Sequence, residues 1–209
     1  MKQMNRRVLL ASAAVAALAS TAFAQEEKAV VVDKLALNTP PAMGDMSMGK
    51  DDAKVVVIEY ASASCPHCAD FATTQFGKFK ADFIDTGKVK FIFREFPHND
   101  AALGAFMIAR CAPKEKYFPL IDVFFKTQKD WVPNPLEGLK KIALQSGFTE
   151  ESFNACLNNK DVAKAIFEVR EKADGFGVQG IPTFFINGDH YKGDYPVEGL
   201  KAAIDPLLG

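Results

Sequence analysis

Two cysteines, Cys65 and Cys68, stand at the junction between a predicted buried strand and a predicted helix. The residues before them, 54–60, form an apolar and mostly β-branched run, which is typical of a strand covered on both faces. Phenylalanines near helical spacing follow the cysteines as far as Gly87, and a second strand pattern occupies 89–94. This β-α-β order predicts a parallel pair of strands, with the cysteines at the carboxyl end of the first, where open α/β sheets bind their ligands.

The C-x-x-C spacing predicts two thiols that can close into a disulfide and reopen. A cysteine at a helix N-terminus faces unpaired backbone N–H groups and the positive end of the helix dipole. We therefore expect the pKa of the Cys65 thiol to lie below the free value of about 8.5. Pro66 suits the first helical position, and His67 can stabilise the same thiolate by its dipole, by a hydrogen bond or by its charge. The alternative interpretation of His67 is a simple turn residue.

The N-terminus predicts export. A basic region with Arg6 and Arg7 precedes an apolar stretch at 8–19, and a small-x-small sequence ends at Ala24. We expect residues 1–24 to be a signal peptide cleaved after Ala24, which would deliver the mature chain to the periplasm. The apolar stretch is too short to span a bilayer, which takes about 20 residues. General secretion and the twin-arginine route both remain open.

Charge and cysteine content exclude several protein classes. The chain has 25 basic and 26 acidic residues, and three basic residues fall in the predicted signal peptide, so the mature chain has a formal charge of −4. We find no basic stripe that would indicate a nucleic-acid partner. Hydrophobic residues make up 48% of the chain, which suffices for a compact core without the many disulfides of small secreted domains. The chain has only four cysteines, two of them in the C-x-x-C sequence, and this distribution favours chemistry at that pair.

The remaining pattern divides the chain into a leader and three folded parts. Residues 25–53 are polar and interrupted by proline and glycine, so we expect a flexible leader with at most one short strand at 29–32. Residues 54–98 form the first α/β part. Helical periodicity then fills 99–176, with room for four or five helices, and residues 177–209 restore strand patterns before a last helix. We predict an α/β fold interrupted by an all-helical subdomain.

Cys111 and Cys156 form a second pair within the predicted helical part. Each lies on the apolar face of its helix, so both can point into one core. Export favours a structural disulfide between them, and a loop of about 45 residues would be stabilised by roughly 4 kcal/mol in the chain-entropy description. The alternative is a pair of inert buried thiols.

Metal and haem binding are alternative interpretations of these patterns. Ala69 follows the second cysteine, where haem attachment requires histidine, and zinc would need two further convergent ligands. Soft copper ligands are available in the leader, because thioethers bind copper(I). They are Met43, Met46 and Met48. We expect no metal and no organic cofactor, and we interpret His98 and His190 as solvated turn residues.

The chain resembles the DsbA family of exported thiol-disulfide oxidoreductases from about Lys54 to its C-terminus. The resemblance rests on the tetrapeptide at 65–68, on Glu59 six residues before it, on the helical insertion and on the segment 177–188. Proline followed by histidine between the cysteines is typical of DsbA, whereas thioredoxin usually has glycine and proline there. The family has a thioredoxin fold with an inserted helical domain.

This resemblance implies roles for five residues. Substrate thiolates would attack Cys65 and expel Cys68. A cis bond between Ile181 and Pro182 would present the Ile181 backbone to a substrate peptide, whereas the residues alone favour an ordinary trans proline. Glu59 would be buried and exchange a proton with Cys68, whereas its position alone also allows a carboxylate that points to solvent.

The resemblance also implies a function. A monomeric periplasmic oxidant would donate its disulfide to reduced exported proteins and be reoxidised by a DsbB-type membrane quinone reductase. One alternative is an isomerase or reductase that a different membrane partner keeps reduced. Another is a copper-binding protein with a thioredoxin fold.

Overall fold

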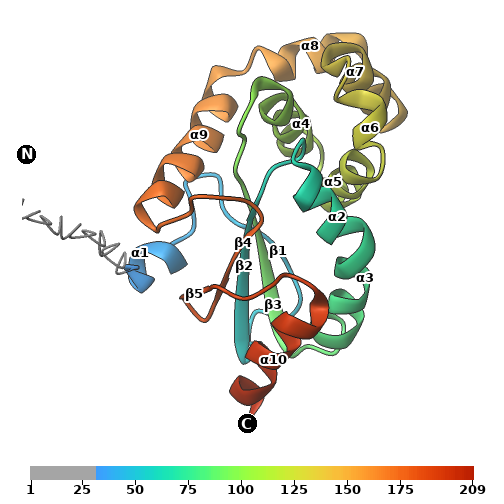
Figure 1. The fold of residues 1–209 in the computed structure, drawn as a ribbon. Helices are drawn as coiled ribbons and strands as arrows, with labels where there is room; N and C mark the ends of the chain where they lie inside the picture. Colours follow the sequence, from blue (N-terminus) through green and yellow to red (C-terminus); the bar gives the residue numbers. More distant parts are fainter. Residues whose placement is uncertain (1–31) are drawn as a thin grey trace, which may run out of the picture.

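The computed structural model describes residues 32–209, which form a five-stranded mixed sheet with helices on both faces (Figure 1). The sheet order is β1-β3-β2-β4-β5. The strands are β1 (Met46–Met48), β2 (Val55–Ala61), β3 (Val89–Glu95), β4 (Thr183–Ile186) and β5 (Asp189–Tyr191). The predicted signal peptide and residues 29–31 of the expected leader strand lie outside the described residues.

Strand β2 is central and confirms the predicted β-α-β unit. It pairs in parallel with β3, where Glu59 lies opposite Phe93, and antiparallel with β4, where Glu59 lies opposite Phe184. Its apolar residues are buried on both faces except the half-buried Val56, as the continuous β-branched run predicts. Because β2 and β3 are parallel, the segments that follow them meet at one edge of the sheet.

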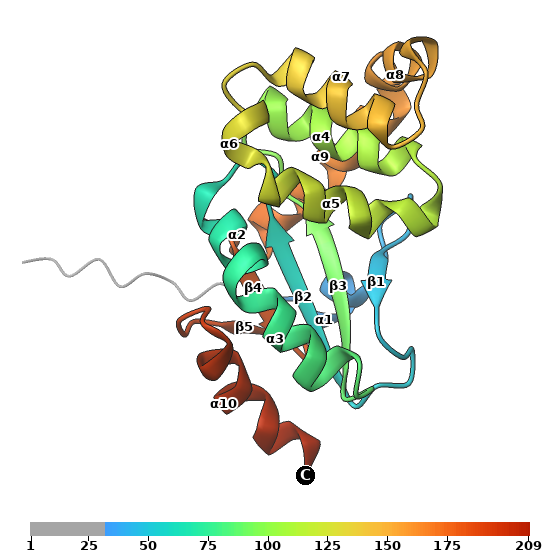
Figure 2. The same cartoon turned by 90° about the vertical axis from the view of Figure 1, so that its right-hand side faces the viewer.

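A long helical stretch connects β2 to β3 and covers one face of the sheet (Figure 2). It comprises α2 (Pro66–Asp70), α3 (Phe76–Phe79) and two π-helical turns, η1 (Phe71–Gln75) and η2 (Lys80–Ile84). Phe79 is fully buried and packs against Phe91 of β3, with ring centroids 6.0 Å apart. Gly87 ends the stretch at φ 74°, a left-handed conformation that favours glycine.

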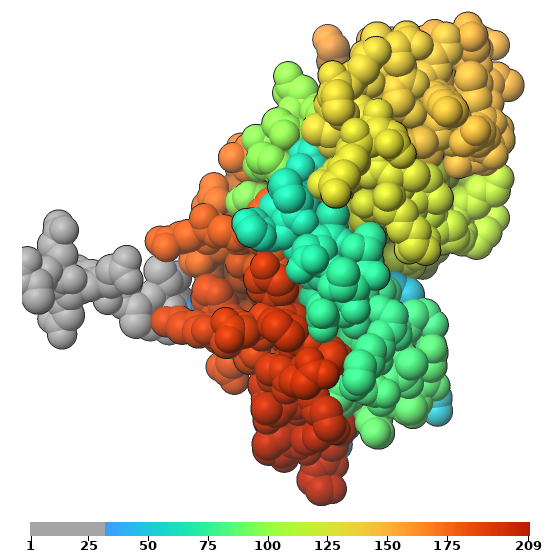
Figure 3. Space-filling view, turned by 45° about the vertical axis from the view of Figure 1, so that its right-hand side comes forward, coloured from blue at the N-terminus to red at the C-terminus, as the bar shows by residue number. Residues whose placement is uncertain are grey.

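The helical insertion contains six α-helices rather than the four or five expected. They are α4 (Asp100–Cys111), α5 (Tyr117–Lys126), α6 (Gln128–Trp131), α7 (Pro135–Gln145), α8 (Glu150–Leu157) and α9 (Lys160–Gly175), with a 3-10 turn at Lys114–Lys116. Only Thr127 separates α5 from α6, so periodicity alone merges them. In Figure 3 the yellow part of the insertion forms a lobe above the green helical stretch.

The last helix of the insertion returns to the sheet. Val169 and Ala173 of α9 join Ile58, Ile92 and Phe185 in an apolar cluster on the second face. The C-terminal helix α10 (Val197–Leu208) packs near α3 on the first face. The insertion therefore contributes one of the layers that enclose the sheet.

The expectation of a flexible leader over 25–53 is wrong for its later part. Residues Lys34–Asn38 form helix α1, and β1 pairs antiparallel with β3. The buried Arg94 guanidinium donates to the Leu37 carbonyl over 2.7 Å and pairs with Asp45 over 2.9 Å. The folded part therefore includes α1 and β1 and does not start at Lys54. The contacts of the buried Arg94 side chain stabilise these short elements.

Two of the three methionines considered as copper ligands belong to this added strand. Met46 is buried and Met48 is half-buried in β1. No helix within residues 32–209 has the length and apolar character that crossing a membrane requires.

Candidate active site

Cys65 and Cys68 begin the helical stretch at the carboxyl end of β2, and both are free thiols. Cys65 is the N-cap residue of α2, and Pro66 occupies its first turn. Cys65 keeps 8% of its surface exposed, whereas Cys68 is fully buried one turn into the helix. Only Cys65 can therefore meet an incoming thiol.

The surroundings of Cys65 favour its thiolate and lower its pKa to about 5. The largest contribution is a hydrogen bond from the Cys68 thiol, and backbone N–H groups of Cys68 and His67 and the charge of His98 act in the same direction. Burial of the sulfur opposes them. The helix N-terminus therefore acts as the sequence predicts, with the partner thiol as the largest contributor.

The surroundings of Cys68 favour its protonated thiol. Burial raises the pKa of Cys68 far above its usual range, and the hydrogen bond to Cys65 and the charge of Glu59 raise it further. The backbone N–H of Ser62, 3.5 Å from the sulfur, opposes this rise. The two sulfurs thus differ strongly in acidity.

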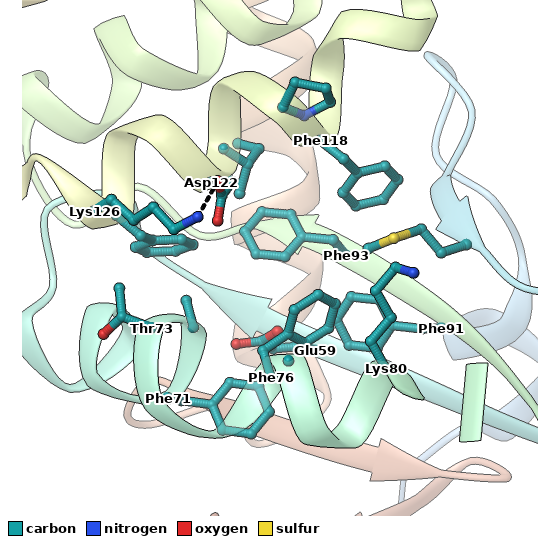
Figure 4. Close-up of a pocket in the computed structure, with 16 residues that line it drawn as sticks. Glu59, Phe71, Thr73, Phe76, Lys80, Phe91, Phe93, Phe118, Asp122 and Lys126 are labelled. Carbon is teal, nitrogen blue, oxygen red and sulfur yellow. Dashed lines mark hydrogen bonds and ion pairs between the residues drawn. The ribbon is translucent and has the colours of Figure 1, made fainter. Parts of the chain in front are cut away.

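Glu59 lies inside the protein next to this pair rather than at the surface. Its side chain projects from β2 into an apolar pocket (Figure 4), and the residue is 3% exposed. Burial raises its pKa to about 8. Within residues 32–209 its carboxyl has no hydrogen-bond or ion-pair partner, which leaves it free to exchange a proton.

The segment at 180–183 faces Cys65 from the other side. The Ile181–Pro182 peptide bond is cis, and the Cys65 thiol donates to the Ile181 carbonyl over 3.7 Å. The Thr183 hydroxyl donates to the Gly180 carbonyl over 2.6 Å and braces the turn. The structure therefore brings Cys65 and Ile181 together.

His67 is exposed, and its ring lies near Tyr195. Its Nδ1 lies 3.5 Å from the Tyr195 hydroxyl, and the described residues include no hydrogen bond from this ring to either cysteine. The contribution of His67 to the Cys65 thiolate in this structure comes from its backbone N–H.

His98 is exposed in a bend, which agrees with its interpretation as a solvated turn residue, but its ring also takes part in a network that the sequence did not predict. His98 Nδ1 lies 2.7 Å from the Ser62 hydroxyl, and the Cys65 N–H donates to the Ser62 carbonyl over 3.1 Å. The Ser64 hydroxyl donates to Asn99 Oδ1 over 2.9 Å. Residues that follow two neighbouring parallel strands meet at one edge of the sheet. The β-α-β pattern could therefore have predicted that residues 96–99 lie beside residues 62–65.

His190 lies in the short strand predicted near this position and is not a solvated turn residue. It lies in β5 and stacks on Phe185, with ring centroids 5.0 Å apart. Burial lowers its pKa.

Cys111 and Cys156 are joined by a disulfide, which links α4 to α8 within the insertion. Cys156 is 4% exposed, and Cys111 is half-buried. Among residues 32–209 there is no group of three or more histidine, cysteine, aspartate or glutamate side chains that could hold a metal ion.

Comparison with known proteins is consistent with this geometry. A family model described as thioredoxin matches residues 42–206. A putative protein-disulfide oxidoreductase of Rickettsia bellii is 36% identical over 170 residues, which cover 78% of this chain and 64% of the relative. The chain therefore spans less than two thirds of that protein. A probable disulfide bond formation protein D of Bacillus cereus is 30% identical, with 78% of each chain covered.

A solved structure has the same fold. The crystal structure of alpha-DsbA1 from Wolbachia pipientis superimposes with a TM-score of 0.76 at 31% sequence identity. The match covers 83% of this chain and 96% of the Wolbachia chain.

Proposed function

The chain belongs to the DsbA-like family of thioredoxin-fold thiol-disulfide oxidoreductases, and from this membership we propose that it oxidises exported proteins by donating a Cys65–Cys68 disulfide. The observation that carries the proposal is the difference in acidity between the two sulfurs, with the pKa of Cys65 near 5 and that of Cys68 raised. Stabilising the Cys65 thiolate stabilises the reduced protein, and this makes its disulfide a stronger oxidant.

The reaction consists of two exchanges at sulfur. A substrate thiolate attacks Cys65, the Cys65–Cys68 bond breaks, and Cys68 leaves as a thiolate that takes up a proton. A second substrate thiolate attacks the substrate sulfur of this mixed disulfide and expels Cys65 as a thiolate. The substrate loses two electrons and gains a disulfide, and the two cysteines of the protein are reduced.

Glu59 supplies the proton in this scheme. Its carboxyl is buried, and a pKa of about 8 keeps it protonated near neutral pH. Cys68 leaves as a strongly basic thiolate because burial disfavours its charge. Because the charge of Glu59 raises the pKa of Cys68, the two groups are disfavoured from being negative together, and the neutral Glu59 carboxyl can pass its proton to the departing thiolate.

Ile181 supplies a backbone contact for the substrate in this scheme. Its carbonyl lies beside the Cys65 sulfur, so a peptide bound along residues 180–182 would hold its cysteine next to the reacting atom. His67 and Pro66 complete the turn that presents Cys65. In this proposal the chain works in the periplasm after cleavage behind Ala24, as a monomer that a DsbB-type membrane quinone reductase reoxidises.

A redox titration tests the direction of electron flow. The variant Cys111→Ala/Cys156→Ala would be equilibrated with glutathione buffers, so that only the Cys65–Cys68 pair responds. We expect a reduction potential well above the value of about −270 mV for thioredoxin. A potential near that of thioredoxin would contradict the proposal and favour a reductase.

A further inference from the structure

A pocket of about 410 Å³ lies between the long helical stretch, β3 and α5, behind the cysteines (Figure 4). Six of the sixteen residues that line it are phenylalanines. Two phenylalanines come from the helical stretch, two from β3 and two from α5: Phe71, Phe76, Phe91, Phe93, Phe118 and Phe125. A volume of this size is in the range of small-molecule sites, which are mostly apolar with a few placed polar groups.

The aromatic walls form two connected groups. On one side the ring centroids of Phe71 and Phe76 lie 6.2 Å apart, and those of Phe76 and Phe91 lie 5.1 Å apart. On the other side Phe93 and Phe125 are separated by 6.3 Å. The faces of phenyl rings carry partial negative charge and attract cations. Among the described residues, no lysine or arginine occupies the face of any of these rings.

Glu59 is the polar group placed within these walls. Its carboxyl lies among Phe71, Phe76 and Phe93 in Figure 4, and it has no hydrogen-bond or ion-pair partner within residues 32–209. Within residues 32–209 no fully buried side-chain oxygen or nitrogen lacks a hydrogen-bond partner, so the small exposed part of Glu59 includes its carboxyl oxygens, which stay accessible from the pocket. Water or a ligand with a complementary group would satisfy it.

The charged residues at the mouth of the pocket compensate one another. Lys126 pairs with Asp122 over 2.7 Å, and Lys80 pairs with Asp85 over 2.6 Å. Glu59, Lys80, Asp122 and Lys126 are the charged residues among those that line the pocket. The charges at the mouth therefore present little electrostatic barrier to a cation. Glu59, the charged lining residue without an ion pair among the described residues, is acidic.

We propose that this pocket binds a small organic cation, an ammonium group carried on an apolar body, with the ammonium against the Glu59 carboxylate and the apolar body against the phenyl rings. The site supplies both features that such a ligand requires, an unpartnered carboxyl and aromatic surface. Because Glu59 has a pKa of about 8, ionising it near neutral pH costs little, and binding of the cation releases its proton.

The test compares a cation with its uncharged isostere. Phenyltrimethylammonium and tert-butylbenzene have nearly the same shape and differ in charge, and their binding to the reduced protein can be followed by NMR. We expect the affinity for phenyltrimethylammonium to rise up to about tenfold per pH unit between about pH 6 and 8 and then to level off. The affinity for tert-butylbenzene should lack this rise.

Two variants and one control variant locate the ligand. Glu59→Gln should weaken phenyltrimethylammonium at least about tenfold near pH 8 and remove its pH dependence, while tert-butylbenzene binding persists. Ala72→Phe adds a ring within the pocket and should block both probes. Thr74→Phe adds the same ring to the same helical stretch at an exposed position that does not line the pocket, so binding should remain.

Equal binding of the two probes without pH dependence would overturn the proposal and leave an unspecific apolar cavity. So would the absence of phenyltrimethylammonium binding at pH 8 to a folded protein, or an unchanged affinity in Ala72→Phe. The measurement involves no thiol exchange, so its result is independent of whether the Cys65–Cys68 pair oxidises substrates.

Discussion

Cys65 and Cys68 are separated by two residues and remain thiols, whereas Cys111 and Cys156 are separated by 45 positions and are joined. The first pair lies at a helix N-terminus among groups that stabilise one thiolate and destabilise the other. The second pair cross-links two helices of the insertion. The difference teaches that the surroundings of a cysteine pair determine whether it serves exchange chemistry or cross-links a fold.

Substitution of Cys65 alone, compared with substitution of both Cys111 and Cys156, should separate the two roles most strongly. Cys65→Ser removes the sulfur that meets the substrate, so oxidation of a reduced model protein should fall to background. Cys111→Ala/Cys156→Ala should retain most of that activity and lose roughly 2 to 4 kcal/mol of unfolding free energy. Refolding of a reduced substrate measures the activity, and urea titration measures the unfolding free energy. Comparable activity loss in both variants would erase the distinction.

Glu59→Gln should change how stability depends on pH. The carboxyl has a pKa of about 8 in the folded protein and about 4.3 in the unfolded chain, so between these values the folded state holds a proton that the unfolded state has lost. Wild-type stability therefore falls as pH rises through this window. The variant lacks this loss and should gain roughly 3 to 5 kcal/mol relative to wild type between about pH 4.5 and 8.

Denaturant titrations of the reduced proteins at both pH values measure this gain. Glu95→Gln is a matched control for a buried carboxyl, because Glu95 is fully buried but accepts hydrogen bonds from Arg110 and Tyr117. It should be destabilised rather than stabilised. A Glu59→Gln protein whose stability follows the wild-type pH profile would show that Glu59 is ionised in the folded state.

Variants of Cys68 should show how much of the acidity of Cys65 comes from its partner. The Cys68 thiol donates the hydrogen bond that contributes most to the lowered pKa of Cys65. Cys68→Ala removes this donor and should raise the pKa of Cys65 by roughly 1 to 2, whereas Cys68→Ser keeps a donor and should raise it less. Thiolate absorbance near 240 nm against pH reports the value. A Cys65 pKa that stays at the wild-type value in both variants would show that the Cys68 thiol does not cause the acidity of Cys65.

The smallest expected effect concerns His98. Its charge contributes to the lowered pKa of Cys65, and its ring holds Ser62, whose backbone contacts both cysteines. His98→Leu should raise the pKa of Cys65 by less than about 1, and His98→Asn should retain part of the contact with Ser62. The same absorbance titration measures this change. A similar rise in Lys50→Leu, which removes an exposed charge before β2, at the opposite end of that strand from Cys65, would show that the effect of His98 is only general electrostatics.

The sequence predicted the sheet centre and the sulfur pair because each depends on local pattern. The β-branched run of β2 and the helix start at Pro66 are visible as residue types at fixed spacing, whereas the cis Ile181–Pro182 bond was predicted only from the family resemblance. Helix α1 and strand β1 are too short for periodicity to reveal. The residues that hold them in place, Arg94 and its strand β3, are distant in sequence. The aromatic pocket depends on α5 packing against η1 and β3, which single-sequence patterns do not report.

The same reasoning explains why His98 was missed. A histidine after a strand has no local pattern that distinguishes a solvated turn from a site residue. Its contact with Ser62 becomes predictable once β2 and β3 are recognised as parallel neighbours. Tertiary contacts of this kind can be predicted from topology rather than from the residue type.

Both outer strands of the sheet, β1 and β5, are only three residues long. An exposed strand edge is a template on which other unfolded chains add strands and aggregate, and short edge strands restrict this. A protein that meets unfolded polypeptides as substrates is especially open to such capture. The brevity of β1 and β5 would let it engage these chains at Cys65 without becoming a nucleus for their aggregation.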